Sequence, residues 1–202
     1  MKRFLMTSGA AAVLALGLAG SAWAVDTTGE IDITGSVGAK CTVITGGPGP
    51  NGANFGATVP LGELADANGH LRSDIQSSTA IGVLTLPFTL SCSGANAAVT
   101  VQADPLANAS AAPTGYANRI DYTANAHFLL IAPVSSTSTL DVTDASSAAG
   151  ATPGSFGSGK YLQNVANNVT ITAYSFGTNS TATDVLVAGA YAGKILVTIT
   201  PS

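Results

Sequence analysis

The chain has 202 residues, of which 46% are hydrophobic, only 9% are charged and 6% are aromatic, and its formal net charge is −4. With seven basic residues it lacks the cationic surface that nucleic-acid binding requires. The low charge and high apolar content likewise exclude a coiled coil and an acidic disordered tail, and they favour a folded domain.

The first 24 residues have the three parts of a secretory signal peptide. Lys2 and Arg3 form a positive head, an apolar run without charge follows, and Ala22-Trp23-Ala24 places small residues around a cleavage site. We therefore predict that residues 1–24 are an export leader and that the mature protein begins at Val25. The apolar run, Ala10 to Gly20, is shorter than a membrane-spanning helix, and a cleavage pattern follows it.

Residues 25–37 alternate between two kinds of side chain. One parity holds Val25, Thr27, Gly29, Ile31, Ile33, Gly35 and Val37, and the other holds mostly charged or hydroxyl side chains. This period of two predicts a β-strand that buries one face. The pattern alone also fits an ordinary first strand of the domain.

Cys41 and Cys92 are the only two cysteines, and both lie in the mature chain. In an exported protein an even pair of cysteines is most simply one disulfide, so we predict that these two are joined. Closing a loop of this length stabilises a fold by about 4 kcal/mol in the chain-entropy model.

Strand patterns dominate the mature chain, and helical periodicity is nearly absent. Residues 83–92 are the clearest case, because apolar residues alternate with Thr85, Pro87, Thr89 and Ser91. Pro87 cannot donate a backbone hydrogen bond, which predicts a sheet edge or a bulge there. Further strands are expected at residues 99–103, 127–131, 169–174 and 194–200. Many short strands without helices predict a single all-β domain, either a sandwich or a barrel.

The segments Thr45–Gly56 and Ser135–Ser158 are rich in small residues and poor in charge, so we predict long surface loops. The sequence offers little for catalysis. Its two histidines are His70, in a turn-like stretch, and His127, expected at the start of a strand, and no serine lies in a G-x-S-x-G motif. The two histidines and two cysteines have no recognised zinc-ligand spacing. We expect no catalytic site, no metal and no cofactor.

Several motifs resemble those of a known family. The segments Gly29-x-Ile31-x-Ile33-x-Gly35-x-Val37, Cys41-Thr-Val43, Val59-Pro-Leu-Gly-Glu-Leu64 and Pro87-Phe-Thr-Leu-Ser-Cys92 resemble the opening of chaperone-usher pilins. The ending, Gly189-x-Tyr191-x-x-x-Ile195-x-Val197-Thr-Ile199, is similar to that of the archaic pilins and the related spore-coat U domain. The resemblance covers about half of the mature chain.

The resemblance implies an immunoglobulin-like β-sandwich, residues 37–202, that lacks its last strand. A neighbouring subunit would complete it with its N-terminal extension, residues 25–36, by donor-strand exchange. The implied donor residues are Val25, Thr27, Gly29, Ile31 and Ile33. The implied acceptor groove is bordered by Val37 and Val43, from a strand over residues 37–43, and by Ile195, Val197 and Ile199.

The resemblance also implies a biological role. The protein would be a structural subunit of a fimbria, exported through the periplasm to the cell surface, that supports adhesion or biofilm formation. Its partners would be copies of itself or related pilins, a periplasmic chaperone and an outer-membrane usher. The alternative is a free-standing secreted β-sandwich, such as a spore-coat U-like surface protein or an adhesin.

Overall fold

The structure is a computed structural model that describes residues 33–45, 55–76, 84–181 and 183–202. One compact unit extends from Ser36 to Ser202. The predicted leader and the predicted donor residues Val25, Thr27, Gly29 and Ile31 lie outside the described residues, as does most of the predicted loop Thr45–Gly56.

Within the described residues the chain forms eleven strands and no helix, as the period-two patterning predicted. None of these residues builds a helix long and apolar enough to cross a membrane. The strands are β1 (Cys41–Thr45), β2 (Leu84–Cys92), β3 (Ala98–Ala107), β4 (Tyr116–Ala117), β5 (Arg119–Ile131), β6 (Thr137–Ala145), β7 (Thr152–Ser155), β8 (Tyr161–Leu162), β9 (Val169–Thr178), β10 (Val185–Leu186) and β11 (Ala192–Thr200).

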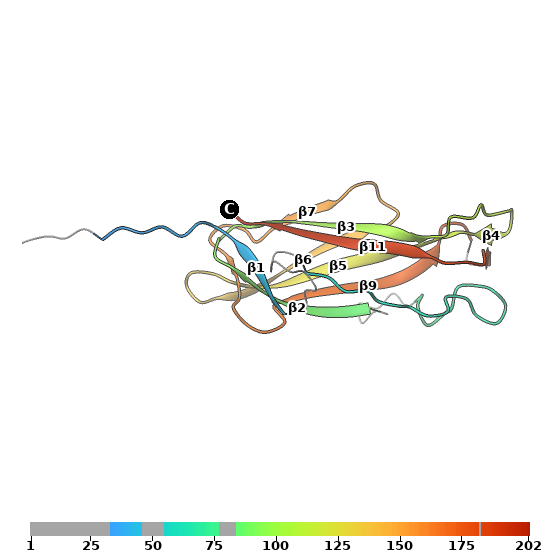
Figure 1. Cartoon of the computed structure of the whole chain (residues 1–202), viewed down its shortest axis with the longest axis horizontal. Helices are drawn as coiled ribbons and strands as arrows, with labels where there is room; N and C mark the ends of the chain where they lie inside the picture. The colour runs from blue at the N-terminus through green and yellow to red at the C-terminus, as the bar shows by residue number, and fades with distance from the viewer. Residues whose placement is uncertain (1–32, 46–54, 77–83, 182) are drawn as a thin grey trace, which may run out of the picture. The chain divides into compact units, whose positions relative to one another are not determined.

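The long strands of this unit form two layers (Figure 1). In one layer the order is β1-β2-β9-β5-β6, and in the other β3 lies between β7 and β11. Among the described strands, the layers are continuous at one corner only, where Leu106 and Ala107 of β3 pair with β5. The unit is therefore an all-β sandwich that approaches a barrel at this corner.

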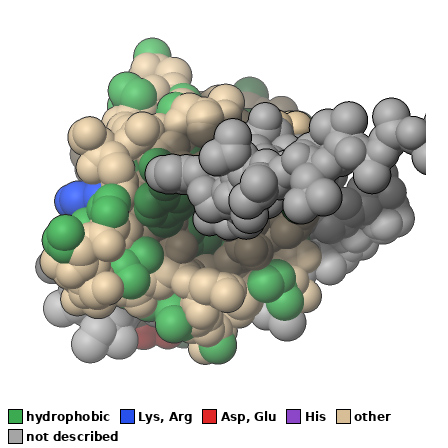
Figure 2. Space-filling view, turned by 90° about the vertical axis from the view of Figure 1, so that its left-hand side faces the viewer, with side chains coloured by type: hydrophobic (Ala, Val, Ile, Leu, Met, Phe, Trp, Pro, Cys, Tyr) green, Lys and Arg blue, Asp and Glu red, His purple; other side chains and the backbone are tan. Residues whose placement is uncertain are grey.

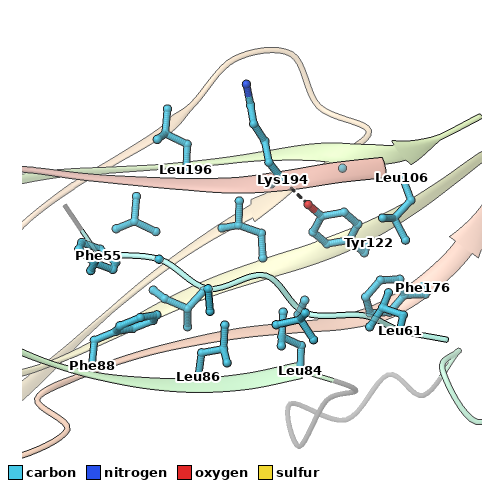
Figure 3. A pocket seen from close by; sticks show the side chains of 18 residues that line it. Phe55, Leu61, Leu84, Leu86, Phe88, Leu106, Tyr122, Phe176, Lys194 and Leu196 are labelled. Atoms are coloured by element: carbon cyan, nitrogen blue, oxygen red, sulfur yellow. Dashed lines mark hydrogen bonds between the residues drawn. The ribbon is translucent and has the colours of Figure 1, made fainter. Parts of the chain in front are cut away.

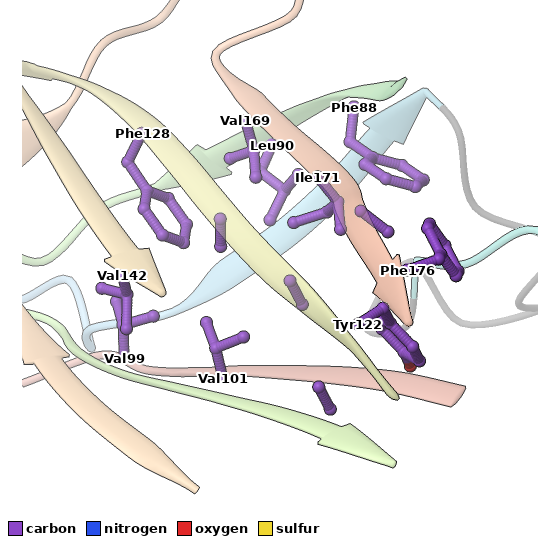
Figure 4. Packing of buried hydrophobic residues seen from close by; sticks show 14 of the residues in the cluster. Phe88, Leu90, Val99, Val101, Tyr122, Phe128, Val142, Val169, Ile171 and Phe176 are labelled. Atoms are coloured by element: carbon purple, nitrogen blue, oxygen red, sulfur yellow. The ribbon is translucent and has the colours of Figure 1, made fainter. Parts of the chain in front are cut away.

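The core lies between the two layers and is organised around β5. Every second residue of β5 is buried, from Ile120 to Leu130, because a strand turns alternate side chains to the same face. Phe128 is fully buried against Phe156 of the segment after β7, with ring centroids 5.6 Å apart. Figure 4 shows Phe128, Val142, Val99 and Val101 directed into the same space between the layers.

The segment Ser135–Ser158 is not the long loop that its composition predicted. It contains β6, which pairs with β5 along nine residues, and β7, which pairs with β3. The inward positions of β6 include Ser138 and Asp144 besides two apolar residues, and these polar side chains hide the period of two. The position of His127 is also corrected, because it lies well inside β5 and contacts Asp141 of β6 at 2.9 Å.

Asp144 joins three strands from the inside of the sandwich. Its carboxylate accepts hydrogen bonds from the Ala103 backbone N–H of β3 (2.8 Å) and from the Thr152 hydroxyl of β7 (2.6 Å). Gly154 of β7 lies so near β6 that a Cβ there would be 2.5 Å from Cγ2 of Val142. We call this side, where β6 and β7 come together, the closed side of the sandwich.

The predicted disulfide is present. Cys41 and Cys92 are bonded and stand opposite each other at the start of β1 and the end of β2. The bond fixes β1 to the sheet, and disulfides of this kind are typical of exported proteins in oxidising surroundings.

Candidate functional site

The side of the sandwich opposite the closed side has two strand edges that no other described strand pairs with over their full length. β11 pairs with β3 along one edge, and no described strand pairs with its other edge. β2 pairs with β9 over Leu84–Phe88, whereas β1 covers only Thr89–Cys92 of its other edge. Pro87 lies in the uncovered part, so the predicted sheet edge at this proline is confirmed. We call the space between β11 and β1–β2 the open side.

A hydrophobic cavity of about 230 Å³ lies on the open side. Leu84, Leu86 and Phe88 of β2 form one wall, and Ile195 and Val197 of β11 form the other. Leu84 and Leu86 are only half-buried, as are Ile195 and Val197. Apolar side chains of two facing strands are therefore incompletely covered along this groove.

A second cavity, of about 490 Å³, continues the groove toward β1. Cys41 and Val43 of β1 and Ile199 of β11 contribute to its lining, and it shares Val197 with the first cavity. The groove therefore extends along most of β11. Seen from this end of the domain, the surface shows few charged side chains, and hydrophobic side chains gather around a hollow (Figure 2).

A segment without regular structure, Phe55–Leu61, lies in the groove, and we call it the strap. Figure 3 shows it between β11 and β2, with Leu84, Leu86 and Phe88 directed toward it. Phe55 packs against Phe88 with ring centroids 5.0 Å apart, and Leu61 is half-buried. Among the described residues no backbone hydrogen bond joins the strap to β2 or β11.

Tyr122 of β5 forms part of the floor of the groove and holds β11 in place. Its hydroxyl lies 2.8 Å from the backbone carbonyls of Asp104 in β3 and Lys194 in β11, and its one proton serves these two acceptors. Figure 3 shows the contact with Lys194. Its ring stacks on Phe176 at 5.2 Å. Burial raises the pKa of the Tyr122 hydroxyl well above its usual value, and the charge of Asp104 raises that pKa further.

The structure brings together four of the five residues predicted to border an acceptor groove. Ile195 and Val197 line the first cavity, and Val43, Val197 and Ile199 line the second. Val37 does not join them, because it is 81% exposed and the strand expected over residues 37–43 begins only at Cys41. Ile33, the one predicted donor residue that the structure describes, is 92% exposed.

Sequence reasoning did not identify the wall from β2, the strap or Tyr122 as parts of this groove. The alternation in residues 84–90 predicted a buried face, but an ordinary core strand has the same pattern. Pro87 was the available signal, because it indicated that this strand has one edge without a partner.

Ionisable groups contribute little to the groove. Two charged residues line the cavities, Lys194 in the first and Lys40 in the second, and the Lys194 ammonium pairs with Asp104 at 3.3 Å. In the described ranges no three His, Cys, Asp or Glu side chains gather as they would around a metal ion. What the groove offers is apolar contact and backbone hydrogen bonds along two edges.

Neither the protein-family models, nor the curated proteins, nor the solved structures gave a match to this chain.

Proposed function

We propose that this protein is a structural subunit of a surface fibre that polymerises by donor-strand exchange, in which residues 25–33 of one copy fill the open groove of the next. The observation that carries the proposal is the groove itself, which has apolar side chains along its length and, on each side, a strand edge with no partner in the described part of the chain. The sandwich would then be of the immunoglobulin-like kind and incomplete until the donor arrives.

The donor segment fits the groove in length and in pattern. Residues 25–33 match β11, which has nine residues, and they alternate in the way a half-buried strand requires. Ile31 and Ile33 supply the two large side chains for the apolar space beside Ile195 and Val197. Gly29 has no Cβ, so the donor backbone can approach the groove walls closely at this position.

Strand addition stabilises both partners. Backbone groups at the free edges of β2 and β11 gain hydrogen bonds, and each apolar side chain buried contributes about 1.5–3 kcal/mol. The donor has three apolar side chains on this face, Val25, Ile31 and Ile33, which would together contribute about 4.5–9 kcal/mol, comparable to the stability of a typical domain, about 5–15 kcal/mol. The resulting fibre would dissociate very slowly.

The occupant we commit to is the donor segment of a second copy. Residues 36–40, which connect this segment to β1, are all exposed and belong to no strand. They join the domain at Cys41, and Cys41 and Ile199 line the same end of the groove. A donor entering its own groove would have to reverse direction before Cys41, whereas the groove of a second copy imposes no such turn.

Two further partners follow from the same chemistry. An open groove with two free edges is a site of unwanted pairing before assembly, so a chaperone that occupies it with a strand of its own is required during export. An outer-membrane usher would then exchange that strand for the donor. The disulfide agrees with passage through an oxidising compartment and with a final place at the cell surface.

The test uses two complementary variants of the full mature chain. Ile33→Asp places a charge on the inserting face of the donor, and Val197→Asp places one in the groove, so each variant loses one of the two roles. Unboiled SDS gels should show a ladder for the wild type and no ladder for either variant. A mixture of the two variants should give a dimer band and nothing larger, because one intact donor meets one intact groove.

Thr34→Asp is the matched control, because it adds the same charge at the next residue, on the opposite face of the donor strand. It should keep the ladder. A ladder that persists in Ile33→Asp overturns the proposal, and so does a mixture that gives no dimer. A heat-stable monomer that Ile33→Asp destabilises would instead indicate insertion into the chain's own groove.

A free-standing secreted sandwich is the second candidate. The strap favours it, since Phe55–Leu61 already covers part of the groove in the single chain. In that case the wild type stays monomeric and is unaffected by Ile33→Asp.

A further inference from the structure

We propose that the strap, Phe55–Leu61, is a built-in competitor for the groove, which must shift before an incoming strand can pair with β2 and β11. The inference rests on the proposed function, because it concerns how access to the same groove is controlled. It assigns a conformational role to a segment that begins in the predicted loop Thr45–Gly56 and continues into the motif Val59–Leu64.

The strap occupies the place that an added strand needs. Phe55, Val59 and Leu61 belong to the lining of the cavity whose opposite walls are β2 and β11. Figure 3 shows the strap passing between these two strands along the cavity. A strand cannot form hydrogen bonds with the edge of β11 while this segment fills the space beside it.

The strap is held in the groove by apolar side-chain contacts. Phe55 stacks obliquely on Phe88 and Leu61 is half-buried, but among the described residues the strap makes no backbone hydrogen bond to either wall. An incoming strand makes similar apolar contacts and adds hydrogen bonds to the two free edges. The strap therefore covers the apolar groove in the single chain, and an incoming strand, which adds backbone hydrogen bonds, can displace it.

The end of the strap is well placed to act as a hinge. After Leu61 comes Gly62, with φ at +73°, and then Leu64, whose carbonyl accepts from the Arg72 backbone N–H at 3.0 Å. The guanidinium of Arg72 donates to the Glu63 carbonyl as well. The chain beyond Gly62 is thus anchored by hydrogen bonds, whereas the strap before it is held by side chains.

The experiment measures how fast the groove captures a strand. The acceptor is the full mature chain carrying Ile33→Asp, so that it cannot donate its own segment, and the probe is a fluorescent peptide with the sequence of residues 25–37. Adding the double substitution Phe55→Ala, Leu61→Ala to this acceptor should raise the capture rate about tenfold, because the strap then loses two large apolar side chains that contact the groove. Thr58→Ala is the matched control, since Thr58 is an exposed strap residue outside the cavity lining. It should leave the rate unchanged.

A second measurement follows the strap directly. Leu61→Cys in the same acceptor chain supplies one free thiol, because Cys41 and Cys92 are joined. Saturating peptide should speed its reaction with a maleimide severalfold as the strap leaves the groove. If peptide is captured but neither the rate nor the thiol reactivity responds, the strap inference is wrong and the proposed function stands. If no acceptor chain captures the peptide, the proposed function fails, and the inference fails with it.

Discussion

The closed and open sides of the sandwich differ in how the gap between the two layers is filled. On the closed side β6 and β7 approach until Gly154 meets Val142, and Asp144 bonds to β3 and β7. On the open side β2 and β11 stay apart, with a cavity and an unpaired strap between them. The domain therefore closes one side with its own residues, whereas on the other side two strand edges stay available for pairing.

The difference shows what a sandwich needs to be complete. A buried backbone N–H costs free energy unless it has an acceptor, and on the closed side a side-chain carboxylate supplies one where no strand does. The open side has no such substitute among the described residues, so its edges depend on water or on another strand. The predictions below change one side at a time.

Asp144→Ala should have the largest effect on stability. It removes two hydrogen bonds and leaves the Ala103 N–H without its acceptor, at a cost of roughly 3 kcal/mol in the free energy of unfolding, measured with urea. Asp141→Ala is the control, because Asp141 is an exposed carboxylate on the same strand, and its exposed pair with His127 is worth about 1 kcal/mol or less. Equal losses for the two variants would mean that the closed side is not held by Asp144.

Adding one methyl group should distinguish the two sides. Gly154→Ala would place a Cβ 2.5 Å from Val142, a stiff and buried side chain, and should cost about 1–3 kcal/mol. Gly56→Ala on the open side meets nothing within 4 Å and should be neutral or stabilising by up to about 1 kcal/mol. The double variant Gly154→Ala, Val142→Ala should recover part of the loss, and thermal unfolding of all four chains checks this. No loss in Gly154→Ala would contradict the tight approach of β6 and β7.

Tyr122→Phe should cost less than either closed-side variant, about 1 kcal/mol at neutral pH, because it loses only the hydroxyl that links β5 to β3 and β11. The same residue makes stability depend on alkaline pH. Burial keeps the pKa of Tyr122 high in the folded chain, whereas a tyrosine in the unfolded chain ionises near pH 10. Above about pH 10 the unfolded state therefore binds fewer protons, and the free energy of unfolding falls as pH rises. Urea titrations at pH 8 and pH 11 should show a smaller fall for Tyr122→Phe, and an equal fall would refute this assignment.

The sequence predicted the all-β fold, the edge at Pro87 and five of the long strands, because these strands carry their signal in their own alternation. It underestimated β5, whose inward positions at Ala124 and Ala126 are small and look featureless, and it missed β6 and β7. β7 contains Pro153 and Gly154, which count against a strand, yet it forms because it lies at an edge and β6 requires a small neighbour. Of the predicted groove, Val43 and the β11 residues were found together, whereas the strap was not foreseen.

The sequence by itself determined features that depend on one segment or on the number of residues of one kind. A period of two specifies which residues share a face of a strand, and two cysteines allow only one pairing. The tertiary structure decided which faces meet: that Asp144 finishes one side of the sandwich, that β2 and β11 leave the other side open, and that Phe55–Leu61 lies between them. The reason is that strand pairing and layer packing join residues far apart in the chain, so the partner of each edge is a property of the assembled sheets and not of any segment alone.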